Sequence, residues 1–393
     1  MKRLLQISLD TLLTSVLPIV MWILLGFIIT KEISNVFTLT YPLQFFYMIF
    51  ISLFAVGPNI TAKRLKNENV IYSNMLFGCI CVGILTLIVV LCSDTYINIM
   101  SMDINIYHNF CIYSMIWMYF SFIMQIITQK LYYEVKNRES NKNNLIFNLS
   151  NFFLIITLTI FLKDYIAITI TLVVDFIIII FLLFKYYKRT KFCLKFKENV
   201  KYTSFSIFED VTLFFTYGIG FVNSFSYGEK YTTAINVESL TTDTQLDILY
   251  SVDTASKIDF ANNKFRYKES LKNAYKLLFV LIGTILIMNL ALYWYFKPDL
   301  KILTILLSIQ IVIMLVDPIV TLKSSYLQII DNNKKHNIFY ALSRVVRLLC
   351  SFIPSGFCTY IGQVFSMIYL YIYSKIQCRK VQIFNIKKEN SLL

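Results

Sequence analysis

The residues most able to do chemistry are acids that interrupt long apolar runs between Lys201 and Phe260. Glu209 and Asp210 interrupt YTSFSIFEDVTLFFTYGIGFV, a run that is otherwise long and apolar enough to cross a bilayer. The next segment, TTAINVESLTTDTQLDILYSVDTASKI, has helix length but too much polarity to face lipid on any side. A carboxylate at membrane depth costs about 3 kcal/mol on insertion scales, so such acids face a bundle interior or a watery cavity and mark an ion or substrate path.

The acids of this second segment are expected to line a substrate cavity, because acidic groups attract cationic ligands. Asp247 lies well inside the segment. For Glu238 and Asp253, nearer its ends, a position in the headgroups or in water is the alternative. The expected cavity residues of this segment are Glu238, Asp243, Gln245 and Asp247.

Asp317 is a further acid in an apolar run, ILTILLSIQIVIMLVDPIVTLKSSYLQII, and Pro318 follows it. A proline removes a backbone donor and leaves a carbonyl exposed beside the carboxylate, and the two together can coordinate a proton or Na⁺. We predict that Asp317 and Asp210 bind the coupling ion together, since two close carboxylates do not both stay ionised cheaply without a cation. The alternative for Asp317 is a buried ion pair with a basic side chain: Lys323, Arg344 or Arg347.

Asp175 is the only acid deep in the first half of the chain, where it interrupts TITLVVDFIIIIFLLF. It either lines the cavity or makes a helix contact to a neighbouring hydroxyl. Asn148 and Asn151 present the same choice, because buried amides either bond across helices or line a polar cavity.

The elements that must position these residues are membrane helices. Of 393 residues, 57% are hydrophobic and 15% charged, whereas soluble domains carry about 25% charged residues. The net charge is +14, but the lysines and arginines cluster between apolar runs, which indicates the positive-inside pattern and not nucleic-acid binding. Eight scattered cysteines and two histidines show no metal-site spacing, and no nucleotide-binding loop or hydrolase motif is present. The sequence therefore predicts a polytopic membrane protein that is not an enzyme.

Hydropathy predicts twelve transmembrane helices. Their expected ranges are 5–29, 37–61, 70–93, 106–133, 144–162, 165–186, 202–225, 230–258, 271–296, 301–329, 336–354 and 357–376. Alternate loops are rich in lysine and arginine, which places these loops and both termini in the cytoplasm. No cleavable signal is expected, because Met1, Lys2 and Arg3 lead into an apolar segment too long for a signal peptide.

The chain also repeats itself weakly at an offset of about 192 residues. QIITQKLYYEVKNRESNKNNLIF lies over DPIVTLKSSYLQIIDNNKKHNIF, so that Asp317 falls on Gln125. Chance similarity among segments rich in Ile, Phe and Asn is the alternative. The repeat indicates two six-helix halves around a central cavity, as in many secondary transporters, with lobes at residues 1–198 and 199–393.

Together these features resemble the multidrug and toxic compound extrusion (MATE) transporters of the oligosaccharidyl-lipid and polysaccharide exporter superfamily. YPLQFFYMIFISLFAVGPNITAKRLKNENV resembles the family's second helix and the basic loop after it, and FSIFEDVTLFF resembles its seventh-helix motif. The resemblance implies that Asp210 or Glu209 is the functional carboxylate of that motif. TTAINV resembles the start of the eighth helix and puts Asn236 on a polar cavity position. LVDPIVTLKSSYLQIIDNNKK resembles the tenth helix and puts Asp317 on a second cation-site carboxylate.

The resemblance and the acids imply a secondary transporter that exports an amphipathic, cationic compound by H⁺ or Na⁺ antiport, with no cofactor besides the transported ion. The alternative is a flippase for a lipid-linked oligosaccharide or another lipid-linked precursor. Its pyrophosphate needs cationic partners, for which Arg344 and Arg347 are the candidates. We expect a monomer in the cytoplasmic membrane whose partners are a small-molecule substrate and the lipid bilayer, and not nucleic acid.

Overall fold

A computed structural model describes residues 17–261, 267–330 and 333–390 of the chain. In these ranges the chain forms helices and no strand. Eight helices of the described residues are long and apolar enough to cross a membrane, which confirms the predicted all-α polytopic membrane protein. The described residues divide into two compact units, 17–226 and 227–390, which we call the first and second units.

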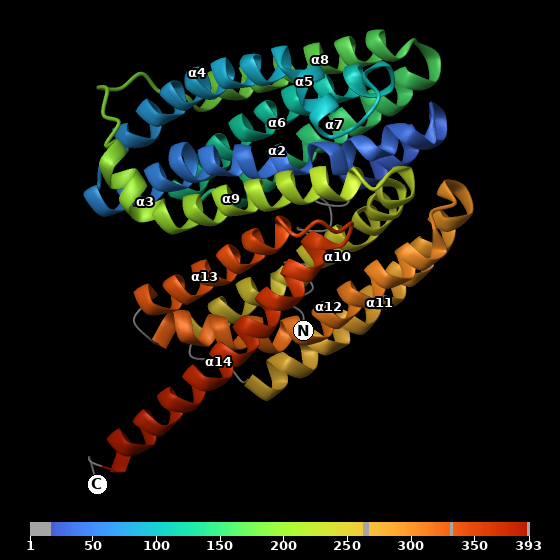
Figure 1. The fold of residues 1–393 in the computed structure, drawn as a ribbon. Helices are drawn as coiled ribbons and strands as arrows, with labels where there is room; N and C mark the ends of the chain where they lie inside the picture. Colours follow the sequence, from blue (N-terminus) through green and yellow to red (C-terminus); the bar gives the residue numbers. More distant parts are fainter. Residues whose placement is uncertain (1–16, 262–266, 331–332, 391–393) are drawn as a thin grey trace. The chain divides into compact units, whose positions relative to one another are not determined.

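The first unit begins with a helix at Leu17–Ile28. It continues with η1 Lys31–Ser34, α2 Asn35–Ile51, η2 Ser52–Val56, α3 Gly57–Leu65, α4 Asn69–Leu91, α5 Ser93–Ile99, α6 Ile104–Tyr133, α7 Asn137–Phe161, α8 Asp164–Tyr186 and α9 Phe196–Phe225 (Figure 1). A π-helical turn, η2, joins α2 to α3 without a break, so that residues 31–65 form one membrane segment. The carboxylate of Asp103 caps α6 by accepting a hydrogen bond from the backbone N–H of Asn105 at 2.9 Å.

α6 lies at the centre of the first unit, where it packs against α2, α4, α7 and α8. α2 and α9 also lie side by side (Figure 1). The ring of Phe45 on α2 stacks on that of Tyr217 on α9, with centroids 5.1 Å apart. Because α9 packs along α2, the compact unit extends through Ser226. The boundary between lobes at residue 198 stays a prediction.

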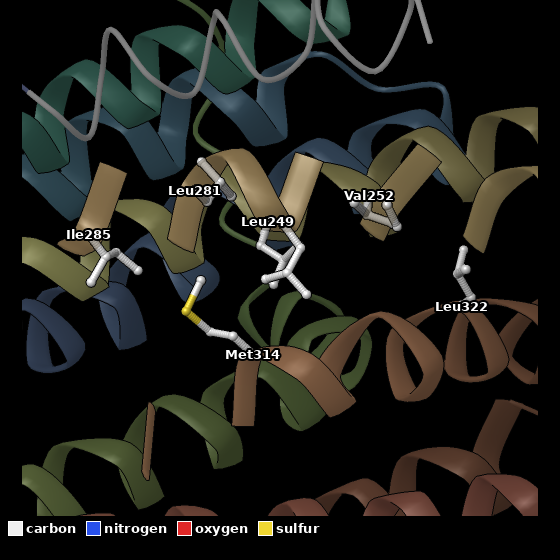
Figure 2. Close-up of a cluster of buried hydrophobic side chains, with 8 residues drawn as sticks. Leu249, Val252, Leu281, Ile285, Met314 and Leu322 are labelled. Atoms are coloured by element: carbon white, nitrogen blue, oxygen red, sulfur yellow. The ribbon is translucent and has the colours of Figure 1, made fainter. Parts of the chain in front are cut away.

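The second unit consists of α10 Glu229–Ala261, α11 Tyr267–Phe296, α12 Leu300–Ile330, α13 Asn333–Ser351 and α14 Cys358–Asn390. α10 packs on α11 and α12, and α14 packs on α12 and α13. Figure 2 shows part of the apolar core, in which Leu249 of α10, Leu281 of α11 and Met314 of α12 lie together. This core packs α10, the most polar of these three helices, against the apolar helices α11 and α12.

The twelve predicted helices correspond to twelve helical segments of the described chain, with residues 31–65 counted as one. Of the first predicted helix, at 5–29, the structure describes Leu17–Ile28, and residues 5–16 lie outside the described ranges. The differences lie at polar ends: α7 begins at Asn137 instead of residue 144, α9 at Phe196 instead of 202, and α14 runs to Asn390 instead of 376. Hydropathy detects the part of a helix that is apolar, whereas the hydrogen-bonded helix continues into charged sequence. The short helix α5 lies where the sequence predicts a loop.

Candidate functional site

Glu238 is a buried acid of the second unit whose carboxylate lies among polar partners. It lies in the third turn of α10, and its side chain is 1% exposed. The hydroxyl of Thr242, one turn further along α10, donates to Oε1 at 2.5 Å, and the phenol of Tyr360 on α14 donates to Oε2. The Gln310 side chain on α12 lies near this carboxylate. Three helices therefore converge on one carboxylate.

Amides and hydroxyls extend this network through the helices around α10. Gln310 Nε2 donates to Oε1 of Gln363 on α14 at 3.0 Å. Asn289 Nδ2 on α11 donates to the hydroxyl of Thr241 on α10 at 2.8 Å. The buried polar side chains of α10 in this region are Asn236, Glu238, Ser239, Thr241, Thr242 and Gln245. These described polar side chains of α10 are therefore buried, as expected for a helix too polar for lipid.

The charge of Glu238 has no basic counterpart in its surroundings. In the part of the chain that the structure describes, no lysine or arginine lies within ion-pair distance of this carboxylate. An isolated buried carboxylate is costly, so such a group either carries a proton or holds a cation. The arrangement can therefore bind a proton or a small cation in a site of carboxylate, hydroxyl and amide groups. The described residues contain no group of three or more His, Cys, Asp or Glu side chains that could hold a metal ion.

Asp317 lies on the same helix as Gln310, two turns further along. It is 7% exposed, and the hydroxyl of Thr321 donates to its Oδ2 at 3.2 Å. α10 and α12 run in the same direction, because α11 returns the chain between them. Gln310 of α12 lies near Glu238 of α10, and Asp317 lies two helical turns beyond Gln310. The second unit therefore presents two polar levels, with Glu238 at the first and Asp317 at the second.

Lys323, one of the basic residues considered as a partner for Asp317, lies over the ring of Tyr371 at 5.5 Å. Arg344 donates to the phenol of Tyr340 at 2.9 Å and lies over its ring. Two of the three candidate bases thus have aromatic contacts.

In the first unit, Asp175 on α8 forms a second buried polar network. Its side chain is fully buried, and Asn151 Nδ2 on α7 donates to its Oδ2 at 2.5 Å. The phenol of Tyr113 on α6 donates to Oδ1 of Asn151 at 2.7 Å. Asp175 Oδ1 is buried without a hydrogen-bond partner among the described residues. Asn151 therefore bonds across helices, one of the two predicted alternatives, and the contact of Asp175 is to an amide instead of a hydroxyl.

Asp210 of α9 is tied to the π-helical turn in the same unit. The hydroxyl of Ser52, the first residue of η2, donates to Asp210 Oδ2 at 3.1 Å. π-helical turns are rare and often lie at functional sites. Asp210 and its neighbour Glu209 are both partly buried.

The predicted site residues are thus divided between the two units. Asp175, Glu209 and Asp210 lie in the first unit, and Asn236, Glu238, Gln245 and Asp317 lie in the second. Asp243 and Asp247 belong to α10, and their side chains lie outside the described part of the structure. The joint ion site of Asp210 and Asp317 stays a prediction. Sequence reasoning missed Tyr360 and Gln310, which are polar residues in helices chosen for their apolar character, and it missed Thr242, because only the acids and amides of α10 were considered.

Solved structures with the same fold are membrane transporters and a flippase, whereas the sequence matches no protein-family model and no curated protein sequence. A multidrug resistance MATE family transporter of the MOP superfamily, inward-facing, superposes with a TM-score of 0.63 at 12% identity, covering 97% of this chain and 96% of the other. A MOP superfamily transporter from Pyrococcus furiosus gives 0.61 at 12% identity, with 97% and 96% covered. The lipid II flippase MurJ, inward closed, gives 0.65 at 16% identity, with 94% and 87% covered. This chain therefore has the fold shared by MATE transporters and MurJ, as the resemblance in its sequence predicts.

Proposed function

We propose that this protein is a secondary transporter that exports an amphipathic, cationic compound in exchange for H⁺ or Na⁺. The observation that carries the proposal is Glu238, a buried carboxylate that accepts hydrogen bonds from Thr242 and Tyr360 and has no basic partner among the described residues. The MATE-like fold supports transport over catalysis, because its solved relatives are transporters or flippases.

The chemistry of Glu238 suits an exchanger. A carboxyl group that holds a proton or Na⁺ is neutral, and release of that ion leaves a negative charge that a cationic substrate can neutralise in turn. Ion and substrate then oppose each other's binding by the same factor, which is the coupling that antiport needs. Asp317, two turns beyond Gln310 on the neighbouring helix α12, provides a second carboxylate for the same exchange.

The test is transport by the purified protein in proteoliposomes, with an H⁺ or a Na⁺ gradient imposed separately and a panel of lipophilic cations as substrates. Glu238→Gln removes the charge but keeps the shape, so gradient-driven accumulation should fall at least tenfold while downhill equilibration persists. The control is Glu229→Gln, an exposed acid at the start of the same helix, which should transport normally. Full uphill transport by Glu238→Gln under both gradients would refute the proposal.

A flippase for a lipid-linked precursor is the second candidate. The similarity to MurJ favours it, as does Arg347 of α13, which is 7% exposed and carries a charge able to pair with phosphate. Proteoliposomes that carry a fluorescent lipid-linked pyrophosphate oligosaccharide distinguish the two functions. Flipping that Arg347→Gln abolishes and Glu238→Gln spares would favour the flippase.

A further inference from the structure

A groove of about 530 Å³ runs between α7 and α8 in the first unit. Its residues fall into two chemical classes. The apolar ones are Ile146, Ile177, Ile178, Phe181 and Leu182, and the polar ones are Glu139, Lys142, Asn143 and Lys185. The polar residues occupy the first turns of α7 and the last turn of α8. These ends meet because the two helices form an antiparallel hairpin, so the groove is basic at one end and apolar along its length.

The apolar walls of the groove lie on the outer surface of the unit. Ile177 is 60% exposed, Phe181 66% and Ile146 47%. Both helices are among those long and apolar enough to cross a membrane. This groove is therefore expected to face lipid. Its concave shape lets one acyl chain contact both helices.

The polar end of the groove is held in place by a chain of hydrogen bonds. Asn143 Nδ2 donates to the phenol of Tyr186 at 2.9 Å, and that phenol donates to Glu139 Oε1 at 2.6 Å. Lys185 Nζ donates to the same oxygen at 3.1 Å and lies 4.8 Å from the Tyr186 ring. Lys185 is thus fixed at the mouth of the groove.

The charge that remains at this end is positive. Glu139 is matched by Lys185, and exposed Lys142 adds a cation to the same lining. At the nearby end of α6, Glu134 lies 2.9 Å from both Lys130 and Lys136. Burial raises the pKa of Glu134, but the hydrogen bonds and charges of these two lysines lower it by more. The pKa of Glu134 therefore lies below its usual value. Each acid at this end therefore has a basic partner, and lysine is in excess.

A second groove on the same unit lacks the basic end. It measures about 460 Å³, lies between α6 and α8, and includes Tyr165, from the opposite end of α8, in its lining. No lysine or arginine lines it. The basic end is therefore a feature of the groove between α7 and α8 that the groove between α6 and α8 lacks.

We propose that the groove between α7 and α8 binds an anionic glycerophospholipid. Its phosphate lies against Lys142 and Lys185, and an acyl chain lies along Ile146, Ile177 and Phe181. Basic pockets between membrane helices suit anionic headgroups, and lysine stems can lie along apolar surface while their charge reaches the interface. A zwitterionic lipid lacks the net negative charge that the excess lysine selects.

The experiment measures retained lipid by native mass spectrometry, after reconstitution in equal amounts of phosphatidylglycerol and phosphatidylcholine and extraction in mild detergent. The wild-type protein should retain phosphatidylglycerol in preference to phosphatidylcholine. Lys142→Gln should reduce retained phosphatidylglycerol at least fivefold. Its matched control is Lys163→Gln, an exposed lysine at the opposite end of the hairpin, which should retain the wild-type level.

A second variant tests the apolar part of the groove without altering charge. Ile177→Trp fills the groove and should also release the lipid, whereas Phe184→Trp, 82% exposed on α8 and outside the groove lining, should not. Size-exclusion chromatography and thermal unfolding establish that each variant is folded. Equal retention of the two lipids by the wild-type protein, or wild-type retention by either Lys142→Gln or Ile177→Trp, would overturn the proposal.

Discussion

At the scale of single residues, the carboxylate of Glu238 is solvated by hydroxyl donors from two helices. Donors from α10 and α14 replace the water that a carboxylate loses on burial. Removing one donor from such a network leaves a buried acceptor partly unsatisfied, which costs more than the bond itself contributes.

Tyr360→Phe should therefore lower the free energy of unfolding by about 1–3 kcal/mol. Tyr369→Phe, a hydroxyl removal further along the same helix, is the control and should have a smaller effect. Chemical unfolding in detergent micelles measures both. In a Glu238→Ala background, Tyr360→Phe should lose most of its cost, because the acceptor is already gone. Additive effects of the two substitutions would contradict the contact.

The sequence predicted which residues are acidic at membrane depth but not which of their partners matter. Asp175 was expected either to line a cavity or to touch a hydroxyl, and its partner is the amide of Asn151. Tyr360 lies 122 residues from Glu238, and nothing local to either position marks the contact. Pairs brought together only by helix packing leave no periodic signal in a single sequence.

At the scale of elements, α2, η2 and α3 form one segment that meets α4 at a close approach. A Cβ atom at Gly78 of α4 would lie 2.8 Å from Cβ of Phe54, which belongs to η2. A Cβ contact this short does not relax by a side-chain rotation, because Cβ is fixed to the backbone. Gly78 therefore lets α4 pack against η2, the turn from which Ser52 donates a hydrogen bond to Asp210.

Gly78→Ala should destabilise the protein by about 1–3 kcal/mol, the usual cost of overpacking. Gly283→Ala on α11 is the matched control, since nothing lies within 4 Å of its added Cβ. Alanine should there be neutral or stabilise by up to about 1 kcal/mol, through its better helix propensity. The thermal unfolding temperatures of the two variants in one detergent report the difference. Similar temperatures would mean that α4 and η2 pack less closely.

At the scale of the whole molecule, apolar runs were sufficient to place twelve helical segments, because membrane-spanning helices satisfy all their backbone hydrogen bonds internally. The same signal cannot locate π-helical η2 or short α5, which differ from their surroundings in backbone geometry and not in hydropathy. It also cannot assign α9, which lies in the second half of the sequence but packs with α2.

The charges of the alternating loops predict the orientation of the chain in the membrane. Two lysines, Lys130 and Lys136, lie at or beside the turn between α6 and α7. The turn between α7 and α8 has one basic residue, Lys163. Positively charged loops stay in the cytoplasm, and an even number of crossings returns the chain to the side where it began. Green fluorescent protein fused after residue 136 or at the carboxyl terminus should therefore fluoresce. Alkaline phosphatase should be active only when it is fused after Lys163. Phosphatase activity at the carboxyl terminus would mean an odd number of crossings, and phosphatase activity after residue 136 would reverse the predicted cytoplasmic position of the basic groove end.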